Sequence, residues 1–84
     1  MQTLKKIIGI DPGLINTGWG LIEVEGNVIR HIDHGLIKIK TSDDIAVRLL
    51  NIYEALILIL SKYMPDEASI EKTFVNKNPN SSLK

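Results

Sequence analysis

The 84-residue sequence predicts an incomplete α/β domain: a mixed sheet with three antiparallel strands, a crossover helix and a fourth, parallel strand. Three observations support this class. Apolar runs rich in β-branched residues recur between short turn signals up to Lys40, a helical pattern follows, and one further apolar run comes after it. A strand that is reached through a helical crossover lies parallel to its neighbour, with a right-handed connection.

Three strands are expected before the helix. Residues 5–11 combine β-branched side chains with a Pro-Gly turn signal directly behind them, which favours a buried strand. A second strand is expected over residues 18–25, and Glu25-Gly26-Asn27 is typical of a hairpin. The third strand, residues 28–40, is expected to bend near His34-Gly35. Short connections make these three strands an antiparallel meander.

The helix is expected to run from a cap at Thr41 or Ser42 to about Tyr63. Asp43 and Asp44 would then lie in its first turn, where exposed backbone amides and the helix dipole favour carboxylates. Its apolar residues follow helical spacing along one stripe: Ile45, Leu49, Ile52, Leu56, Ile59, Leu60 and Tyr63. Other apolar residues lie outside this stripe, and a helix that is apolar on more than one side is usually covered from two directions.

The fourth strand, residues 67–71, follows a helix stop at Met64-Pro65-Asp66 and is expected beside the first strand. Its free edge and the second side of the helix need partners that these residues do not supply. A polar loop follows, and it ends in helix-start residues before Leu83-Lys84. We therefore expect residues 1–84 to form one part of a single domain.

Composition limits the classes of function. Ten basic and ten acidic residues give a formal net charge of zero, so the total shows no basic surface of the kind that a dedicated nucleic-acid binder carries. The absence of cysteine excludes disulfides and thiolate metal sites. The first apolar run is too short for a signal-peptide core, and no segment reaches the length of a membrane span. A soluble, cytoplasmic protein is the expectation.

Two carboxylates end apolar runs that are predicted to be neighbouring parallel strands: Asp11 follows Ile10, and Glu71 follows Ile70. Parallel neighbours bring both to the same end of the sheet. Mg²⁺ prefers oxygen ligands, and a pair of such ions stabilises the attacking and leaving oxygens of an in-line phosphoryl displacement. Each residue alone has a structural interpretation, since Asp is common at turn starts and Glu at solvated strand ends. The pair favours a metal site.

Three glycines follow Asp11 in the sequence: Gly13, Gly18 and Gly20. They either let the backbone approach a phosphate closely or permit a tight turn and a close strand crossing. The structural interpretation is favoured. Trp19, which lies between two of them, is predicted to be a core residue.

Other candidates also have two interpretations. Phe74 either stacks on unpaired bases, with Lys72 and Lys77 beside it for phosphates, or covers the core beneath its loop. His31 and His34 have no further ligand pattern around them. They are predicted to be surface or structural residues rather than ligands.

These motifs, taken in order, resemble the amino-terminal half of the RuvC family of Holliday-junction resolvases, which have a ribonuclease H-like fold. The resemblance extends over nearly all of the chain. Its motifs are Ile8-Gly9-Ile10-Asp11-Pro12-Gly13, Thr17-Gly18-Trp19-Gly20, Arg48-Leu49, Ile52-Tyr53, Ile70-Glu71-Lys72-Thr73-Phe74 and Asn76-Lys77-Asn78. No single motif is decisive, but the ordered set is specific.

The resemblance implies a Mg²⁺-dependent endodeoxyribonuclease that cleaves four-way DNA junctions in recombination and repair, as a homodimer and with a branch-migration complex as partner. Asp11 and Glu71 would be two of four catalytic carboxylates that hold two Mg²⁺ ions, for which Mn²⁺ could substitute. Phe74 would face bases near the junction. The other two acidic positions of the family lie near the carboxyl terminus of a longer chain. These 84 residues alone are therefore expected to be inactive on DNA.

Two other classes of function stay open. Actin-like ATPases and sugar kinases have a related fold, and their first phosphate loop also follows a strand as Ile-Asp-x-Gly. Here Leu14-Ile15-Asn16 replaces the small and hydroxyl residues of that loop. A non-catalytic piece that binds branched DNA or a partner chain through its exposed edge and residues 72–84 is the other alternative. Binding of ATP would favour the first, and DNA binding that falls steeply with salt would favour the second.

Overall fold

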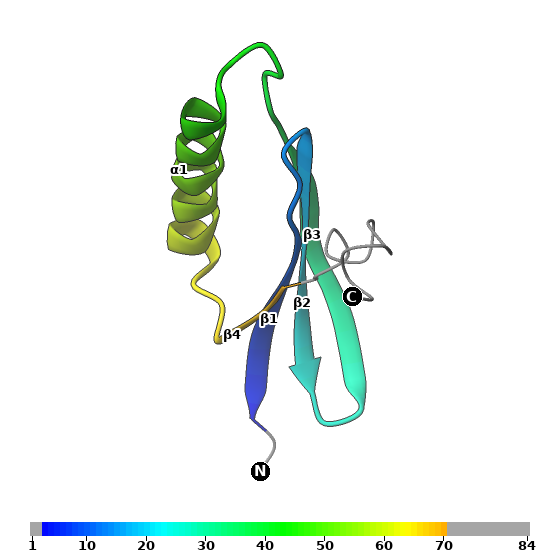
Figure 1. Ribbon diagram of the computed structural model, residues 1–84. Helices are drawn as coiled ribbons and strands as arrows, with labels where there is room; N and C mark the ends of the chain where they lie inside the picture. The colour runs from blue at the N-terminus through cyan, green and yellow to red at the C-terminus, as the bar shows by residue number, and fades with distance from the viewer. Residues whose placement is uncertain (1–2, 71–84) are drawn as a thin grey trace, which may run out of the picture.

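The sheet has the mixed topology that the sequence predicts. The computed structural model describes residues 3–70, in which one helix lies on one side of a four-stranded sheet (Figure 1). The elements are β1 (Leu4–Asp11), β2 (Asn16–Glu25), β3 (Val28–Lys38), α1 (Ile45–Tyr63) and β4 (Glu67–Ile70). The strand order is β3-β2-β1-β4, with antiparallel pairs along the meander and a parallel pair between β1 and β4. The predicted fold class is confirmed.

The crossover through α1 places β4 beside β1. Ile70 is the partner of Ile10 in this parallel register. Asp66, the residue before β4, is also fixed to β1 by two hydrogen bonds. Asp66 N donates to Lys6 O, and Lys6 N donates to the Asp66 carboxylate, each at 2.8 Å. β1 therefore has a hydrogen-bonded neighbour on both sides and is a central strand.

The core lies between the sheet and the last turns of α1. Ile8 and Leu21 are fully buried and Ile10 nearly so. The side chains packed against them are Trp19, Leu56, Ile59, Leu60 and Tyr63. The first half of the predicted stripe does not belong to the core, since Ile45 and Leu49 are more than half exposed. The helix residues that contact the buried strand side chains all come from its carboxyl-terminal half.

The start of α1 differs from the prediction. The N-cap is Asp44 rather than Thr41 or Ser42, because the Asp44 carboxylate accepts a hydrogen bond from Val47 N at 3.1 Å. Asp43 precedes the helix, so no acidic residue lies in the first turn. The helix therefore begins later than predicted, because the Asp44 carboxylate caps its exposed amides in place of the Thr41 or Ser42 hydroxyl.

The ends of the meander strands also differ from the prediction. β2 begins at Asn16, two residues before the predicted start, and β3 ends at Lys38. Asn16 is the partner of Lys38 in the register, and Ile39 N donates to Ile15 O at 3.0 Å. Asn16 and Thr17, which were predicted to lie in the turn, therefore belong to β2 because they pair with β3.

β3 contains a β-bulge close to the bend predicted at residues 34–35. Asp33 and His31 pair with consecutive residues of β2, so Ile32 between them is an extra residue. The irregularity thus lies two residues before the predicted bend. A bulge reverses which face the following side chains occupy, so His34 lies on the same face of the sheet as His31.

Trp19 connects β2, β3 and α1, which confirms its predicted place in the core. Its indole lies over Gly35, where a Cβ would come within 2.8–2.9 Å of the ring. Its ring centroid is 6.0 Å from that of Tyr63. The Tyr63 hydroxyl donates to the Asp33 carboxylate, and this bond, with a second from the His34 amide, holds the pKa of Asp33 below its ordinary value. The end of α1 is thereby tied to the bulge.

Much apolar surface is left uncovered, as the two-sided pattern of the helix predicts. No residue of α1 is buried. The exposed apolar side chains of the helix are Ile45, Val47, Leu49, Leu50, Tyr53, Ile57 and Leu58. No other element among residues 3–70 covers the sheet face opposite to α1 (Figure 1). Within the same residues, no helix combines the length and apolarity that a membrane crossing needs.

Candidate active site

Asp11 is the last residue of β1, and its side chain lies on the sheet face opposite to α1. This follows from alternation, because Ile8 and Ile10 face the helix and the residues between and after them face away. Its partner on β2 is Gly18. The residue is exposed. A central strand therefore presents a carboxylate at its carboxyl end, as the sequence predicts.

A shallow cavity of about 210 Å³ lies beside this carboxylate, and we refer to it as the Asp11 cavity. Its lining residues come from β1, β2 and β4: Gly9, Ile10, Asp11, Gly18, Trp19, Gly20 and Ser69. A Cβ at Gly9 or Gly20 would meet no atom within 4 Å. Packing among the described residues therefore does not require glycine at these two positions, and the glycines leave the backbone open next to the carboxylate.

The turn after Asp11 does require its glycine. A Cβ on Gly13 would collide with the carbonyl oxygen of Asn16. Gly13 N donates to the Thr17 hydroxyl at 3.2 Å, and that hydroxyl donates to Gly13 O at 3.0 Å. Thr17 is fully buried. The structural interpretation is correct for Gly13, since the closed turn sets the direction in which the chain leaves Asp11.

The remaining predicted site residues cannot be placed beside Asp11. Glu71, Phe74, Lys72 and Lys77 lie outside the described residues, so the pairing of the two carboxylates stays a prediction. Two of the lining residues, Gly9 and Ser69, were not among the predicted site residues. Their signal was present, because they stand two positions before Asp11 and Glu71, and residues at this spacing share one face of a sheet.

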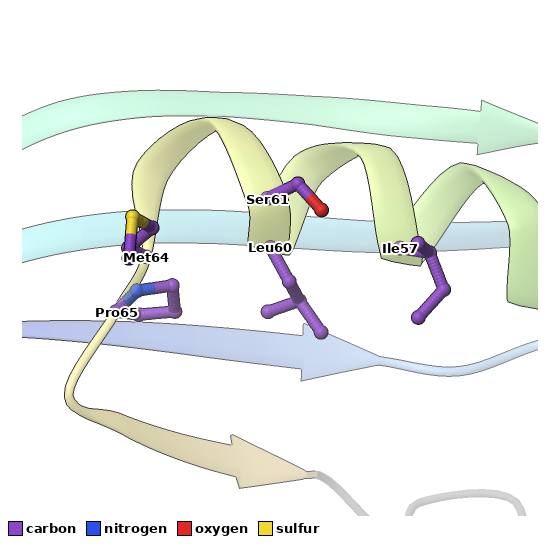
Figure 2. Close-up of a pocket in the computed structure, with 5 residues that line it drawn as sticks. All are labelled: Ile57, Leu60, Ser61, Met64 and Pro65. Carbon is purple, nitrogen blue, oxygen red and sulfur yellow. The ribbon is translucent and has the colours of Figure 1, made fainter.

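A larger cavity of about 650 Å³ lies at the end of α1 (Figure 2). Its lining residues are Ile57, Leu60, Ser61, Met64 and Pro65, none of which is ionisable. It belongs to the helix side of the sheet, whereas Asp11 faces the other side. We attribute it to the uncovered surface of the helix, and the smaller Asp11 cavity is the candidate for chemistry.

The chemistry at Asp11 fits a hard cation in part. A carboxylate oxygen is the ligand type that Mg²⁺ prefers. Residues 3–70 contain no group of three or more histidine, aspartate or glutamate side chains that could hold an ion. Asp11 therefore fits as a single oxygen ligand, and residues 3–70 do not complete a set of ligands around it.

The mixed sheet and its crossover helix belong to a known class of fold, the ribonuclease H-like fold. Solved structures of RuvC from Thermus thermophilus have this arrangement. The structure in complex with a Holliday junction substrate matches with a TM-score of 0.74 and 23% identity, over 81% of this chain and 42% of that one. A second RuvC structure matches with a TM-score of 0.71 and 24% identity, over 80% and 42%. At these identities the likeness concerns the fold.

The sequence comparisons give the family. A family model described as "Crossover junction endodeoxyribonuclease RuvC" matches residues 7–84, and the chain belongs to this family. The relative of that name from Rhizobium johnstonii is 45% identical over 84 residues, which are 100% of this chain and 50% of the relative. The one from Paramagnetospirillum magneticum is 44% identical over 79 residues, 94% of this chain and 48% of the relative. The chain spans about half the length of the curated relatives it matches.

Proposed function

We propose that residues 1–84 are the amino-terminal portion of a ribonuclease H-like nuclease domain that cleaves four-way DNA junctions in recombination and repair. The observation that carries this proposal is the carboxylate of Asp11, at the end of a central strand and beside a glycine-lined cavity, in a chain of the RuvC family. The family match favours this nuclease over the actin-like ATPase and sugar-kinase alternative. A DNA substrate is consistent with a cytoplasmic protein.

The register of the parallel pair supports a second carboxylate next to the first. Ile10 and Ile70 are partners, and the next residues in the sequence are Asp11 and Glu71. Extending the register by one residue would set the two carboxylates side by side, on the face that carries the Asp11 cavity. Two neighbouring carboxylates repel each other, and a cation bound between them would remove this repulsion. The arrangement therefore favours a metal site.

In the proposed mechanism, Asp11 and Glu71 would hold Mg²⁺, two ions per complete site, with Mn²⁺ as a substitute. When bound, these ions supply Lewis-acid activation of the scissile phosphate and of the attacking water. The chain's own residues position the reactants. The β1–β2 ladder and the closed turn orient Asp11, and the exposed glycine backbone lets a phosphate lie close to the sheet. Phe74 stacks on bases near the junction, and Lys72 and Lys77 contact phosphates.

The complete protein is proposed to act as a homodimer that nicks two opposed strands, with branched DNA and a branch-migration complex as partners. Two further acidic ligands come from the part of the relatives that this chain does not span. A site with half of its carboxylates neutralises the charge of bound cations incompletely and binds them weakly. The 84-residue chain by itself is therefore expected not to cleave DNA.

The test joins residues 1–84 to the second half of the Rhizobium johnstonii relative, and cleavage of a four-way junction in Mg²⁺ is measured. The joined protein should cleave, and Asp11→Asn should lower the rate by about a thousandfold, the scale of losing one electrostatic stabiliser of a transition state. Junction binding, measured by gel shift, should persist. Asp43→Asn, the same chemical change before α1, serves as the control and should leave the rate unchanged. Cleavage by the Asp11→Asn protein at the parent rate would remove Asp11 from the site.

A further inference from the structure

The two histidines of the chain, His31 and His34, lie side by side on β3. His31 Nε2 and His34 Nδ1 are 2.9 Å apart and share a hydrogen bond, and the ring centroids are 5.0 Å apart. Both residues are exposed. Alternation places them on the same sheet face as Asp11, but on a strand separated from β1 by β2.

The bulge at Ile32 is what brings the two imidazoles together. Residues three apart on a regular strand point to opposite faces of the sheet. The extra residue removes this alternation, because His31 pairs with Ile22 and His34 with Gly20, which are two residues apart on β2. Bulges commonly re-aim side chains in this way.

The backbone between the histidines is anchored from the other face. Asp33 accepts the hydroxyl of Tyr63 from α1, and it accepts the backbone amide of His34 at 2.8 Å. The core packing of Tyr63 holds this anchor in turn. The two histidine Cα atoms therefore keep their relative positions without help from the shared hydrogen bond between their rings.

We propose that His31 and His34 chelate one transition-metal ion of the Cu²⁺, Ni²⁺ or Zn²⁺ class through these two nitrogens. Nitrogens bound at about 2.0–2.1 Å lie roughly 2.9 Å apart at a right angle and roughly 3.3 Å apart at a tetrahedral angle. The observed separation of 2.9 Å equals the right-angled value and is about 0.4 Å shorter than the tetrahedral one. Imidazole suits these ions, and a right-angled nitrogen pair suits Cu²⁺ and Ni²⁺.

Charges near the pair do not oppose a cation. The guanidinium of Arg30 lies next in the sequence but on the opposite face by alternation, and it pairs with Glu23 at 3.5 Å and Glu25 at 3.8 Å. Since the part of the chain that the structure describes holds no group of three potential ligands, water or an added ligand would complete the coordination shell. Mg²⁺ prefers oxygen ligands, so this site is chemically distinct from the one proposed at Asp11.

The test is calorimetric titration of the 84-residue chain with Ni²⁺, followed by Cu²⁺ and Zn²⁺, in the presence of excess Mg²⁺. One ion should bind per chain. The sequence has two histidines and no cysteine, so each single substitution removes one imidazole and leaves the other. His31→Ala and His34→Ala should each lower the Ni²⁺ affinity on the order of a hundredfold, because the second bond of a chelate forms at a high effective concentration. Lys38→Ala, elsewhere on β3, should leave the affinity unchanged.

A second measurement does not depend on variants. The electron paramagnetic resonance spectrum of Cu²⁺ bound to the unmodified chain should show hyperfine coupling to two imidazole nitrogens. Coupling to one nitrogen would overturn the proposal, as would single-histidine variants that keep their fold by circular dichroism and bind Ni²⁺ as tightly as the parent. Absence of Ni²⁺ binding by the parent chain would also overturn the proposal.

Discussion

Gly20 and Gly35 of this sheet differ in whether another side chain packs against them. Gly35 lies under the indole of Trp19, which also contacts Tyr63 and the core. Gly20 lies on the other face, beside Asp11, and a Cβ there would meet nothing within 4 Å. Both occur in strands where glycine is unfavourable in itself, because it has no side chain to pack and a large conformational freedom to lose. A side chain at position 35 would displace the indole, whereas position 20 borders open space beside Asp11.

The two glycines therefore predict different responses to the same substitution. Gly35→Ala should lower the free energy of unfolding by about 1–3 kcal/mol, since the added methyl forces Trp19 out of its place. Gly20→Ala should change it by no more than about 0.5 kcal/mol. Urea unfolding monitored by tryptophan fluorescence compares the two, and Trp19 is the one tryptophan of the sequence. Equal losses in the two variants would contradict the packing assigned to Gly35.

At the scale of the element, α1 is delimited by local chemistry at both ends. Asp44 caps its amino terminus through the Val47 amide. At its carboxyl terminus, Met64 has φ 49° and donates its N–H to Leu60 O, and Pro65 follows. Left-handed residues satisfy the last carbonyls of a helix, and a proline after them prevents its continuation. These ends direct the chain from the helix into β4 and hence into the parallel register beside β1.

The capping role of Asp44 is testable by substitution. Asp44→Ala should lower the free energy of unfolding by about 1 kcal/mol, the usual cost of losing an N-cap side chain. Ser42→Ala, at a position that the sequence pattern suggested as the cap, should have an effect within about 0.5 kcal/mol. Thermal and urea unfolding followed by circular dichroism at the helix band measure both. A larger effect at Ser42 than at Asp44 would show that the helix starts earlier in solution.

At the scale of the whole molecule, the core is thin and the apolar surface is large. The fully buried side chains of the described residues are Ile8, Leu21 and Thr17. The outer side of α1 and the sheet face around Asp11 have no cover among residues 3–70. Large contiguous apolar surfaces normally mark a contact with another segment or chain. The structure is therefore that of a subset of a domain, in agreement with a chain that spans about half of its relatives.

This exposed surface predicts self-association of the isolated chain. Leu58 is 73% exposed on α1, so Leu58→Glu should reduce the associated fraction and leave the melting temperature unchanged. Leu60, two residues later, packs against the core, so Leu60→Glu should destabilise the fold by about 3 kcal/mol or more. Size-exclusion chromatography with light scattering, together with thermal melting, separates the two effects. A monomeric parent chain would contradict the prediction.

The elements and their order could be predicted because their signals are local. Spacing of apolar residues, Pro12-Gly13 and Met64-Pro65 are sufficient to place strands, turn and helix. Three features could not be predicted from local patterns: the start of β2, the cap at Asp44 and the exposure of the first half of α1. The first and the last depend on contacts with residues distant in the sequence, and the cap depends on competition between neighbouring side chains for the same amides. The pairing of Asp11 with Glu71, and the roles of Phe74, Lys72 and Lys77, stay predictions.

Local patterns were sufficient to predict that Asp11 ends a central strand, that β4 lies parallel to β1, and that the apolar surface of the helix needs further cover. Two features are visible in the folded structure alone: Asp11 shares its face with a glycine-lined cavity, and His31 lies against His34. The physical reason is that side-chain direction in a sheet depends on register. One extra residue, Ile32, changes that register through cross-strand hydrogen bonds, which no local pattern in the sequence specifies.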